Sequence, residues 1–387
     1  MAVAAFGAYT ISNRTQTQLQ ASSTPAATPT ATPTPTSTSP SAPSTSPYST
    51  QQPSETTTPT YPPTPTSTAT PSPTATPPTN ITLVDATGAT VTVSLPVNRV
   101  VSLNSGFTEL ICALGAADKL VGRDELSKYP DYVANVSVVA QNSYQPNIEA
   151  LLQAQPDLVV ADTMLAYNQD ALGKIKNAGI PVIIENPSNS TRLDTMIQNL
   201  GLALGKSERA NELLNYIHYY LNLVYNRVGN LTSSKPLVYI EWYTAWRSFG
   251  PGSAGNQLIV EAGGTNIAAN VSTAYPTLSA EYVAEKNPDV IIRMISGNLV
   301  GNLTGYQATW QEIITRPGLK DVTAVKTGHV YIYDPIITQG IRYPIGLLYF
   351  AKWLHPETFA DINPAAIHDD FTRKFYGVSI QGVYVFP

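Results

Sequence analysis

Aromatic and arginine side chains gather in one short stretch of the sequence, WYTAWRSFGPGS. It contains Trp242, Tyr243, Trp246 and Arg247. Indole and phenol rings offer large rigid surfaces for stacking, and a guanidinium pairs with carboxylates or phosphates and also stacks on flat rings. This composition favours contact with a large, partly planar ligand that carries acidic groups. Each residue taken alone also fits an ordinary surface tyrosine or ion-pair arginine, so the prediction depends on their convergence.

Similar residues follow other predicted strands. Ligands of open α/β sheets bind beyond the carboxyl ends of the strands, which defines where contacts are expected. The arginines at these points favour an anionic ligand, and Tyr144 and Tyr243 could either ligate a metal or stack on the ligand. The expected positions are Asn104, Ser105, Phe107, Arg123, Tyr144, Asp162, Thr163, Met164 and Tyr167 in the first half of the chain, and Trp242, Tyr243, Trp246, Arg247, Phe249, Arg293, Arg342 and Tyr343 in the second half.

Short apolar runs that alternate with helical periodicity predict the elements that carry these residues. A hairpin is expected over 81–95, and strands over 99–103, from 120, and over 157–161, 181–185, 237–241, 289–294 and 329–334. Helices are expected after Thr108, which could cap the first, then over 147–153, 168–178 and 191–205, from 254, and over 345–354 and 369–375. The segment 123–132, RDELSKYPDY, predicts a polar loop. Strands that alternate with helices imply parallel sheets covered on both faces.

Two distant segments repeat the same helix-to-strand unit. They are IEALLQAQPDLVV at 148–160 and AEYVAEKNPDVII at 280–292, and alignment on their Pro-Asp pairs places Glu149 opposite Glu281. ELICALGAADKLVG and QLIVEAGGTNIAA form a second pair, in which an apolar helix is closed by glycine. We therefore predict two α/β lobes with mainly parallel central sheets, and a ligand cleft between the lobes.

One long helix is predicted between the two copies. In the segment 207–228, SERANELLNYIHYYLNLVYNRV, apolar residues recur at steps of three and four, which is the spacing of one helix face. At ~1.5 Å per residue it would span roughly 33 Å, about the diameter of a small domain. We expect a first lobe over 81–206, a rigid connecting helix over 207–230 and a second lobe over 231–387. An ordinary amphipathic helix inside one large domain is the alternative.

The N-terminal part has a different composition. Residues 21–80 consist mainly of Thr, Pro, Ser and Ala, which cannot bury enough apolar surface to fold, so an extended disordered stalk is expected. Residues 1–20 open with MAVAAFGAYTI, which is short for a membrane helix and lacks the basic start of a secretory signal. We expect the remains of a signal or membrane anchor there, and a disordered tail is the alternative.

Charge and residue usage point to an extracellular protein that is tethered to the cell surface. The formal net charge is −5 without any basic block, so neither nucleic acid nor an anionic membrane surface is an expected partner. The single cysteine, Cys112, lies in an apolar helix, where a buried side chain is expected. Asn-x-Ser/Thr sequons suggest a glycosylated surface. They begin at Asn13, Asn80, Asn135, Asn189, Asn230, Asn270 and Asn302.

The sequence lacks a recognisable catalytic constellation. Its 4 histidines are scattered, and we find no metal-spaced Cys/His cluster, nucleophile elbow or phosphate-binding glycine loop. We therefore expect a protein that is not an enzyme and has no cofactor. A chelatase-like enzyme and a structural surface glycoprotein remain alternatives. The histidines are His218, His329, His355 and His368.

Several motifs, in order, resemble the substrate-binding proteins of ATP-binding-cassette (ABC) importers for ferric siderophores, haem and cobalamin. They are RVVSL, FTELICALGAADKLVGRDELSKYP, NIEALLQAQPDLVV, NQLIVEAGGTNI and IRYPIGLLYFAKWLHPE, and the resemblance covers about residues 98–357. It implies two α/β lobes joined by one rigid helix, a ligand in the cleft, and a membrane permease as partner. It also implies that Arg342 is a cleft arginine and that Tyr144 takes the place of a ligand-stacking tryptophan.

The resemblance further implies one glutamate on each lobe that docks into arginines of the permease. Glu149 matches the first of these, whereas the second falls at Val260, with Glu261 one position along. A monomer that captures an iron(III) chelate of siderophore type and delivers it to the importer is the expected function. Binding of cobalamin or haem in the same importer class is the alternative. Because one helix connects the lobes, small motion between them is expected.

Overall fold

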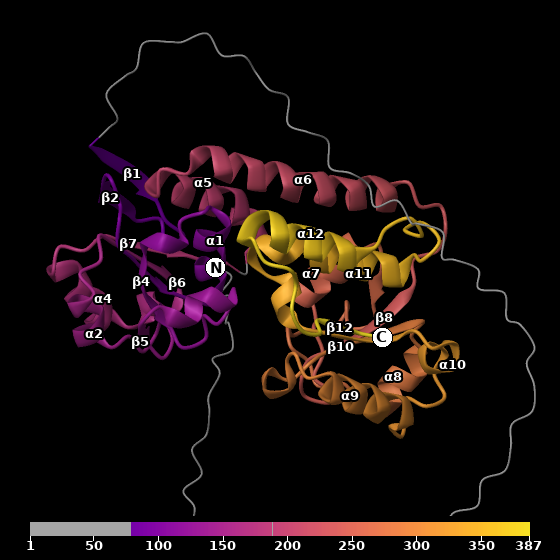
Figure 1. Cartoon of the computed structure of the whole chain (residues 1–387). Helices are drawn as coiled ribbons and strands as arrows, with labels where there is room; N and C mark the ends of the chain where they lie inside the picture. Colours follow the sequence, from indigo (N-terminus) through magenta and orange to yellow (C-terminus); the bar gives the residue numbers. More distant parts are fainter. Residues whose placement is uncertain (1–78, 188) are drawn as a thin grey trace, which may run out of the picture. The chain divides into compact units, whose positions relative to one another are not determined.

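The computed structural model describes residues 79–187 and 189–387 (Figure 1). These residues belong to one compact unit, Glu55–Pro387. The predicted anchor over 1–20, nearly all of the predicted stalk over 21–80 and the sequon at Asn13 lie outside the described residues. No helix in the described part of the chain is both long enough and apolar enough to cross a membrane.

The first lobe, lobe 1, is built on a five-stranded parallel sheet in the order β5-β4-β3-β6-β7. Its central strands are buried on both faces, which explains their uninterrupted apolar runs. Helices α1 and α5 belong to the core on one face of the sheet, and α2 and α4 to the core on the other. The strands are β3 Val100–Leu103, β4 Leu120–Asp124, β5 Val138–Ala140, β6 Leu158–Asp162 and β7 Val182–Glu185; the helices are α1 Ser105–Ala113, α2 Ile148–Gln153, α3 Met164–Tyr167, α4 Gln169–Asn177 and α5 Leu193–Ala203; the hairpin is β1 Asn80–Val84 with β2 Thr90–Ser94; and the 3₁₀ turns are η1 Ala117–Lys119, η2 Asp131–Asn135 and η3 Ser190–Arg192.

The second lobe, lobe 2, has a five-stranded sheet in the order β12-β11-β10-β8-β9. All neighbouring strands pair in parallel except β12, which pairs antiparallel with β11. The strands are β8 Leu237–Glu241, β9 Thr265–Asn266, β10 Val290–Met294, β11 Val330–Tyr333 and β12 Val385–Phe386; the helices are α7 Ala254–Glu261, α8 Ala280–Lys286, α9 Leu303–Thr315, α10 Thr323–Thr327, α11 Tyr343–Leu354 and α12 Pro364–Tyr376; and the 3₁₀ turns are η4 Gly297–Leu299, η5 Pro335–Thr338 and η6 Gly340–Arg342.

The two lobes share a four-stranded core of identical order, as the repeated sequences predict. The order β4-β3-β6-β7 in lobe 1 corresponds to β9-β8-β10-β11 in lobe 2. The Pro-Asp pairs have the same structural role in both. Asp157 Oδ2 accepts hydrogen bonds from the amides of Asn98 and Arg99, just before β3, and Asp289 Oδ2 accepts one from the amide of Leu237, the first residue of β8. The aspartate thus fixes where the central strand begins in each copy.

Helix α6, Ser207–Gly229, connects the lobes and packs on α5 of lobe 1 and on α11 of lobe 2 (Figure 1). Its buried face includes Leu213, Leu214, Ile217 and Val224, all from the predicted apolar stripe. With 23 residues at ~1.5 Å each, the helix spans roughly 35 Å. The largest core cluster contains side chains of both lobes and of α6. The predicted fold class, two α/β lobes with mainly parallel sheets and a long helix, is confirmed.

Some local predictions were wrong. The helix α1 is capped by Asn104, whose side chain accepts from the amide of Gly106, whereas Thr108 is buried inside the helix. The segment predicted as a polar loop from 123 begins with the buried end of β4. Strand β5 is too short to show a periodic pattern, and α9, α10 and β12 were not predicted. Helix α12 begins at Pro364, five residues earlier than the predicted start at 369.

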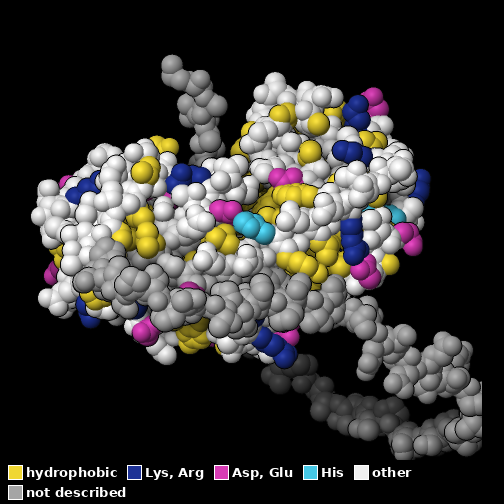
Figure 2. Space-filling view, turned by 90° about the horizontal axis from the view of Figure 1, so that it is seen from above, with side chains coloured by type: hydrophobic (Ala, Val, Ile, Leu, Met, Phe, Trp, Pro, Cys, Tyr) yellow, Lys and Arg dark blue, Asp and Glu magenta, His cyan; other side chains and the backbone are white. Residues whose placement is uncertain are grey.

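Positive and negative side chains are interspersed over the visible surface on the α6 side of the molecule (Figure 2). Hydrophobic side chains lie between them in small groups. This distribution agrees with the lack of a basic block in the sequence.

Candidate functional site

The candidate site is a cleft where the carboxyl ends of strands from both lobes meet. A cavity of about 60 Å³ lies there. At its edge, the amide of Gly340 in lobe 2 donates to the carbonyl oxygen of Pro187 in lobe 1 at 2.9 Å. Apart from Glu109, its polar side chains are uncharged. The lining residues are Asn104, Ser105, Gly106, Glu109 and Pro187 from lobe 1, and Ile336, Gln339, Gly340 and Ile341 from lobe 2.

The lobe 1 side of the cleft is held by Asp162, at the end of β6. Its Oδ2 accepts from Asn104 Nδ2 at 2.8 Å, and its Oδ1 accepts from the amide of Met164 at 2.9 Å and from the hydroxyl of Ser143. Asn104 also caps α1, which places Ser105 at the cleft. The structure therefore brings Asn104, Ser105, Asp162 and Met164 together as predicted, with Asp162 as the residue that orients the others.

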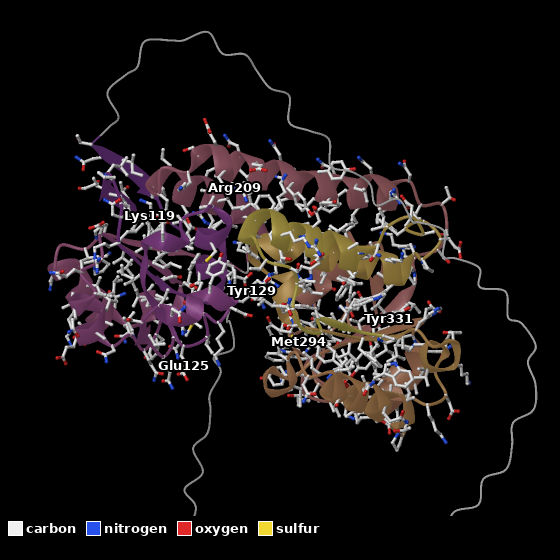
Figure 3. The ribbon with its side chains drawn as sticks, in the orientation of Figure 1. Lys119, Glu125, Tyr129, Arg209, Met294 and Tyr331 are labelled. Atoms are coloured by element: carbon white, nitrogen blue, oxygen red, sulfur yellow. The ribbon has the colours of Figure 1, made fainter. Side chains whose placement is uncertain are left out.

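Arg342 lies beside the cleft, but its guanidinium is committed to an ion pair between the lobes. Its Nε donates to Glu109 Oε2 at 2.7 Å, and the hydroxyl of Tyr376 donates to the same oxygen at 2.9 Å. Arg342 is 1% exposed and Glu109 4% exposed. The ring of Tyr129 covers the guanidinium at 4.4 Å, and Figure 3 shows Tyr129 on the side of lobe 1 that faces lobe 2. Burial and the charge of Arg342 lower the pKa of His368, which contacts the same guanidinium, to about 2, so this imidazole is neutral.

Two other predicted cleft arginines are also engaged. Arg123 donates to the carbonyl oxygens of Val133, Asp124 and Ala134, at 3.0, 3.1 and 3.3 Å, and so braces the turn that follows β4. Arg293 pairs with Glu241 and donates to the carbonyl oxygen of Tyr243. Both side chains are buried. Of the four arginines predicted at the cleft, three are thus engaged by groups within the protein, although Arg293 Nε and Arg342 Nη2 have no hydrogen-bond partner.

Residues 242–249, which we call the aromatic loop, form a cluster of half-buried rings at the carboxyl end of β8. Trp242 lies 4.8 Å from Tyr243 and 5.3 Å from Tyr275 between ring centroids, with the buried Phe249 6.2 Å behind. The guanidinium of Arg247 lies 5.9 Å from the Trp242 ring, and its Nε has no hydrogen-bond partner. Sequence reasoning missed Tyr275, which comes from a separate loop. We call Trp242, Tyr243 and Tyr275 the aromatic platform.

Trp246 points away from this platform. Its indole packs between the guanidinium of Arg316, at 4.8 Å, and the ring of Tyr239, at 6.5 Å with an interplanar angle of 26°. It is partly buried and packs against a core cluster of lobe 2. Trp246 is therefore placed as an anchor of the loop, although its sequence position predicted a ligand contact.

The remaining predicted contacts are spread over different environments. Phe107 is fully buried in the main core, so its side chain does not reach the cleft. Tyr144 and Tyr167 are 43% and 72% exposed on lobe 1, close to Asn168, whose amide nitrogen donates to the carbonyl oxygen of Tyr144. Tyr343 is buried and donates to Glu261 at 2.7 Å. The side chains of Tyr144 and Tyr167 are thus accessible on the surface of lobe 1.

Glu149 and Glu281 occupy equivalent exposed positions in the two lobes. Each lies in the first turn of the helix that leads to a Pro-Asp strand, α2 or α8. The helices are capped alike, because Asn147 Oδ1 accepts from the amide of Ala150 and Ser279 Oγ from that of Tyr282. Hydrogen bonds from its own amide and from Ser279 lower the pKa of Glu281, which keeps it ionised.

Glu261, by contrast, is held by other side chains. Its Oε2 accepts from Tyr225 of α6 at 2.9 Å and from Tyr343 of α11 at 2.7 Å, and its Oε1 accepts from Gln257 at 2.6 Å. Val260 is 51% exposed and apolar. Neither residue offers a free carboxylate. The pairing of Glu149 with Glu281 was visible in the repeat, so the signal for the better lobe 2 candidate was present in the sequence.

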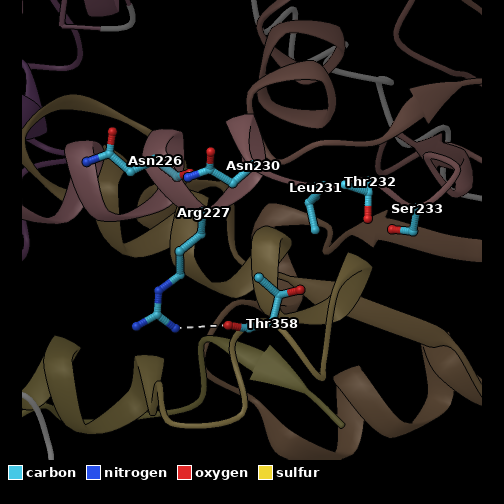
Figure 4. Close-up of a pocket in the computed structure, with 7 residues that line it drawn as sticks. All are labelled: Asn226, Arg227, Asn230, Leu231, Thr232, Ser233 and Thr358. Atoms are coloured by element: carbon cyan, nitrogen blue, oxygen red, sulfur yellow. Dashed lines mark hydrogen bonds between the residues drawn. The ribbon is translucent and has the colours of Figure 1, made fainter.

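A second hollow lies at the C-terminal end of α6 and shares no lining residue with the cleft (Figure 4). Its volume is about 490 Å³, and it is lined by Asn226, Arg227, Asn230 and Thr358 among others. Arg227 already pairs with Asp361 at 2.5 and 2.8 Å and donates to the carbonyl oxygen of Thr358 at 2.9 Å. The one guanidinium of this hollow is therefore engaged within the protein. Among the described residues, no group of three or more His, Cys, Asp or Glu side chains could hold a metal ion.

Comparison with known families identifies the proteins that share this arrangement. The family model described as periplasmic binding protein matches residues 100–337, more than half of the 387 residues. The chain belongs to this family. The matched region of this periplasmic binding protein begins at β3 and ends in η5, so it contains both sheet cores, the connecting helix and most of the cleft.

Three relatives illustrate the similarity. The uncharacterized ABC transporter substrate-binding lipoprotein YvrC of Bacillus subtilis is 27% identical over 292 residues, which cover 73% of this chain and 87% of YvrC. The cobalamin-binding protein of Halobacterium salinarum is 27% identical over 271 residues, covering 67% of this chain and 71% of that protein. The crystal structure of the TroA-like periplasmic binding protein FepB from Veillonella parvula has a TM-score of 0.69 at 26% identity and covers 79% of this chain and 99% of FepB.

Proposed function

We propose that this periplasmic binding protein captures a large metal chelate in the cleft between its lobes and delivers it to an ABC importer in the membrane. The family, the two-lobed fold and the ABC transporter relatives support this proposal. The chain acts outside the cytoplasm as a binding protein and not as an enzyme. The N-terminal residues 1–80 would tether it to the cell surface.

Within this class, the charges around the cleft favour a corrinoid such as cobalamin. The expectation of an anionic iron(III) chelate rested on four arginines. Three of them are engaged, and Arg293 and Arg342 have buried carboxylate partners. Taking Arg342 for a ligand would leave the buried Glu109 without its charged partner, at a cost of about 3–5 kcal/mol. A multiply charged anion would therefore find little positive charge that is free to bind it.

The neutral polar groups of the cleft match a ligand that carries amides. Ser105 and Gln339 offer hydroxyl and amide groups that both donate and accept hydrogen bonds. A corrinoid presents amide side chains around a flat macrocycle and has one phosphate. The aromatic platform would stack on the macrocycle, and Arg247 would meet the phosphate. The similarity to a cobalamin-binding protein agrees with this proposal.

The single observation that carries the corrinoid proposal is the internal pairing of Arg123, Arg293 and Arg342. One observation favours the alternative, a ferric siderophore. Arg247 has an Nε without a partner beside the platform, and this guanidinium could pair with an anionic chelate. The two ligands must therefore be compared directly.

Isothermal titration of the full chain with cyanocobalamin, a ferric hydroxamate siderophore and haemin tests both proposals. We expect saturable binding of cyanocobalamin that weakens in Trp242→Ala. A matched control is Trp310→Phe, because Trp310 packs against Phe386 at the far edge of the lobe 2 sheet. Binding of the siderophore alone would refute the corrinoid assignment and retain the import function. Binding of none of the three would refute the import proposal in this form.

Delivery to the importer would use Glu149 and Glu281. These exposed carboxylates occupy matching positions on the two lobes, whereas Glu261 is engaged by Tyr225 and Tyr343. We therefore assign the second docking contact to Glu281 in place of Glu261. Because α6 and a shared core join the lobes, small-angle scattering should show little change in the radius of gyration when ligand binds.

A further inference from the structure

A buried carboxylate, Glu241, ends strand β8 at the start of the aromatic loop. It is 0% exposed. Its Oε1 accepts from the hydroxyl of Tyr239 at 2.8 Å, the amide of Trp246 at 2.5 Å and the guanidinium of Arg316 at 2.5 Å. Its Oε2 accepts from Arg316 at 3.0 Å and from Arg293. Glu241 thus connects the end of the strand to the loop that follows and to two arginines from elsewhere in lobe 2.

The charges of this cluster are balanced. Arg316 also donates to both oxygens of Glu312, at 2.6 and 2.7 Å, so two guanidiniums face two carboxylates. Although burial alone would raise it, Arg316 and Arg293 hold the pKa of Glu241 below its usual value. The carboxylate therefore stays ionised and accepts all of these hydrogen bonds.

The side chains of Arg293 and Glu241 fix both halves of the aromatic loop. On the first half, Arg293 donates to the carbonyl oxygen of Tyr243 at 2.7 Å. On the second, Glu241 accepts from the amide of Trp246, whose φ of 65° lies in the left-handed region that favours glycine. The amide of Trp242 donates to the carbonyl oxygen of Arg247 at 2.7 Å and closes the turn. A non-glycine residue adopts such a backbone only where its surroundings impose it.

The two tryptophans of the loop face different neighbours. Trp246 packs between Arg316 and Tyr239 inside lobe 2, whereas Trp242 belongs to the aromatic platform. Because only a few residues separate them, immobilising Trp246 restricts where Trp242 can lie. The platform also follows the same sheet edge as Gln339 and Gly340, which line the cleft.

We propose that Glu241, Arg316 and Trp246 form a positioning cluster that holds Trp242 and Tyr243 as a rigid stacking surface for the flat face of the ligand. None of the three needs to touch the ligand. The inference rests on the proposed function, because the surface that is positioned is the one assigned to ligand stacking. Preorganisation of this kind increases affinity by reducing the ordering needed on binding.

The test uses the full chain with Arg316→Lys, Trp246→Ala and the double variant. Arg316→Lys keeps the positive charge next to Glu241 but loses the flat contact with Trp246 and the forked hydrogen bonds. It is preferable to Glu241→Gln, which would leave two buried arginines without their partner and could prevent folding. We expect each single variant to raise the Kd for cyanocobalamin about tenfold. The double variant should bind no more weakly than Trp246→Ala, because both changes disrupt the same cluster.

Arg192→Lys is the matched control. Arg192 pairs with Glu185, a buried carboxylate at the end of β7 in lobe 1 that contacts no aromatic loop. The control should lower the melting temperature by a similar amount and leave the Kd unchanged. An unchanged Kd in Arg316→Lys or Trp246→Ala, or a Kd that follows the melting temperature in all variants, would overturn the positioning role.

A readout without ligand separates this inference from the proposed function. The near-ultraviolet circular dichroism of Trp242 is obtained as the difference between each protein and its Trp242→Phe partner. We expect this difference signal to weaken in Arg316→Lys and to persist in Arg192→Lys. If the wild-type chain binds none of the three ligands, the proposed function fails. The positioning inference is overturned if the Trp242 signal is the same in Arg316→Lys and wild type.

Discussion

Removing the Glu109 carboxylate should destabilise the protein far more than removing an exposed carboxylate. Glu109 of lobe 1 and Arg342 of lobe 2 form an ion pair at 2.7 Å, with side-chain exposures of only 5% and 1%. Glu109→Gln keeps the size of the side chain but leaves the buried guanidinium without its counter-charge. The amide oxygen of glutamine can still accept from Tyr376, so the change removes the charge and not this acceptor.

The burial of the pair determines the expected magnitude. Breaking one partner of a buried ion pair costs about 3–5 kcal/mol, because a buried charge is left uncompensated. The exposed pair of Lys174 and Asp170, with side-chain exposures of 56% and 76%, provides the comparison. Exposed pairs contribute about 0–1 kcal/mol, so Asp170→Asn should have little effect. Glu109→Leu with Arg342→Met removes both charges and should cost less than Glu109→Gln alone.

Urea unfolding followed by circular dichroism measures these free energies. The reasoning requires a loss of at least about 3 kcal/mol for Glu109→Gln and less than about 1 kcal/mol for Asp170→Asn. Equal small losses in both variants would refute it, since they would show that water reaches the Glu109 pair in solution. A double variant less stable than Glu109→Gln would refute the role assigned to the unpaired charge.

Three further predictions follow from the structure. Burial raises the pKa of Asp124 to about 6. The stability that its protonated carboxyl contributes is therefore complete below the pKa of the unfolded state, about 3.9, and is lost as the pH rises through 6. In urea unfolding, Asp124→Asn should gain stability relative to wild type between pH 4 and pH 7.5, and a constant difference would contradict this. Glu149→Ala and Glu281→Ala should each leave cyanocobalamin affinity intact and reduce uptake in reconstituted vesicles, and normal uptake in both would remove the docking assignment. Mass spectrometry of the protein from its native source should find N-glycans at exposed sequons in preference to Asn189, which is half-buried and whose Oδ1 already accepts from Thr191. A glycan at Asn189 alone would contradict this. The exposed sequons begin at Asn80, Asn135, Asn230, Asn270 and Asn302.

Much of the fold could be predicted because it is encoded by local patterns. The stripe of α6 follows from residues three and four apart, and the central strands follow from short apolar runs. The duplication was visible in the two Pro-Asp segments, and the structure explains why, since Asp157 and Asp289 fix the start of the central strand in each lobe. Strand β5 and helix α9 were missed because their patterns are short or irregular.

The candidate site was predictable only as a location. The carboxyl ends of the strands do meet at the cleft, and Asn104 and Ser105 line it as the strand positions implied. The aromatic loop follows β8 at the same edge of the lobe 2 sheet. Whether each side chain is buried, paired within the protein or exposed could not be predicted in this way. Trp242 and Trp246 belong to the same short loop and are both partly buried, yet Trp242 joins the platform whereas Trp246 packs against Arg316.

The sequence by itself determined the two-lobed architecture and the connecting helix, and it located the site at the carboxyl ends of the strands. Only the tertiary structure decided which arginines are free to meet a ligand. The carboxylate that neutralises Arg342 lies 233 residues away in the sequence, and the one shared by Arg316 lies 75 residues away. The local periodicity of apolar residues determines the helices and strands, because it depends on residues only a few positions apart. The charge available at the cleft depends on pairs that form only when distant segments are packed together and water is excluded.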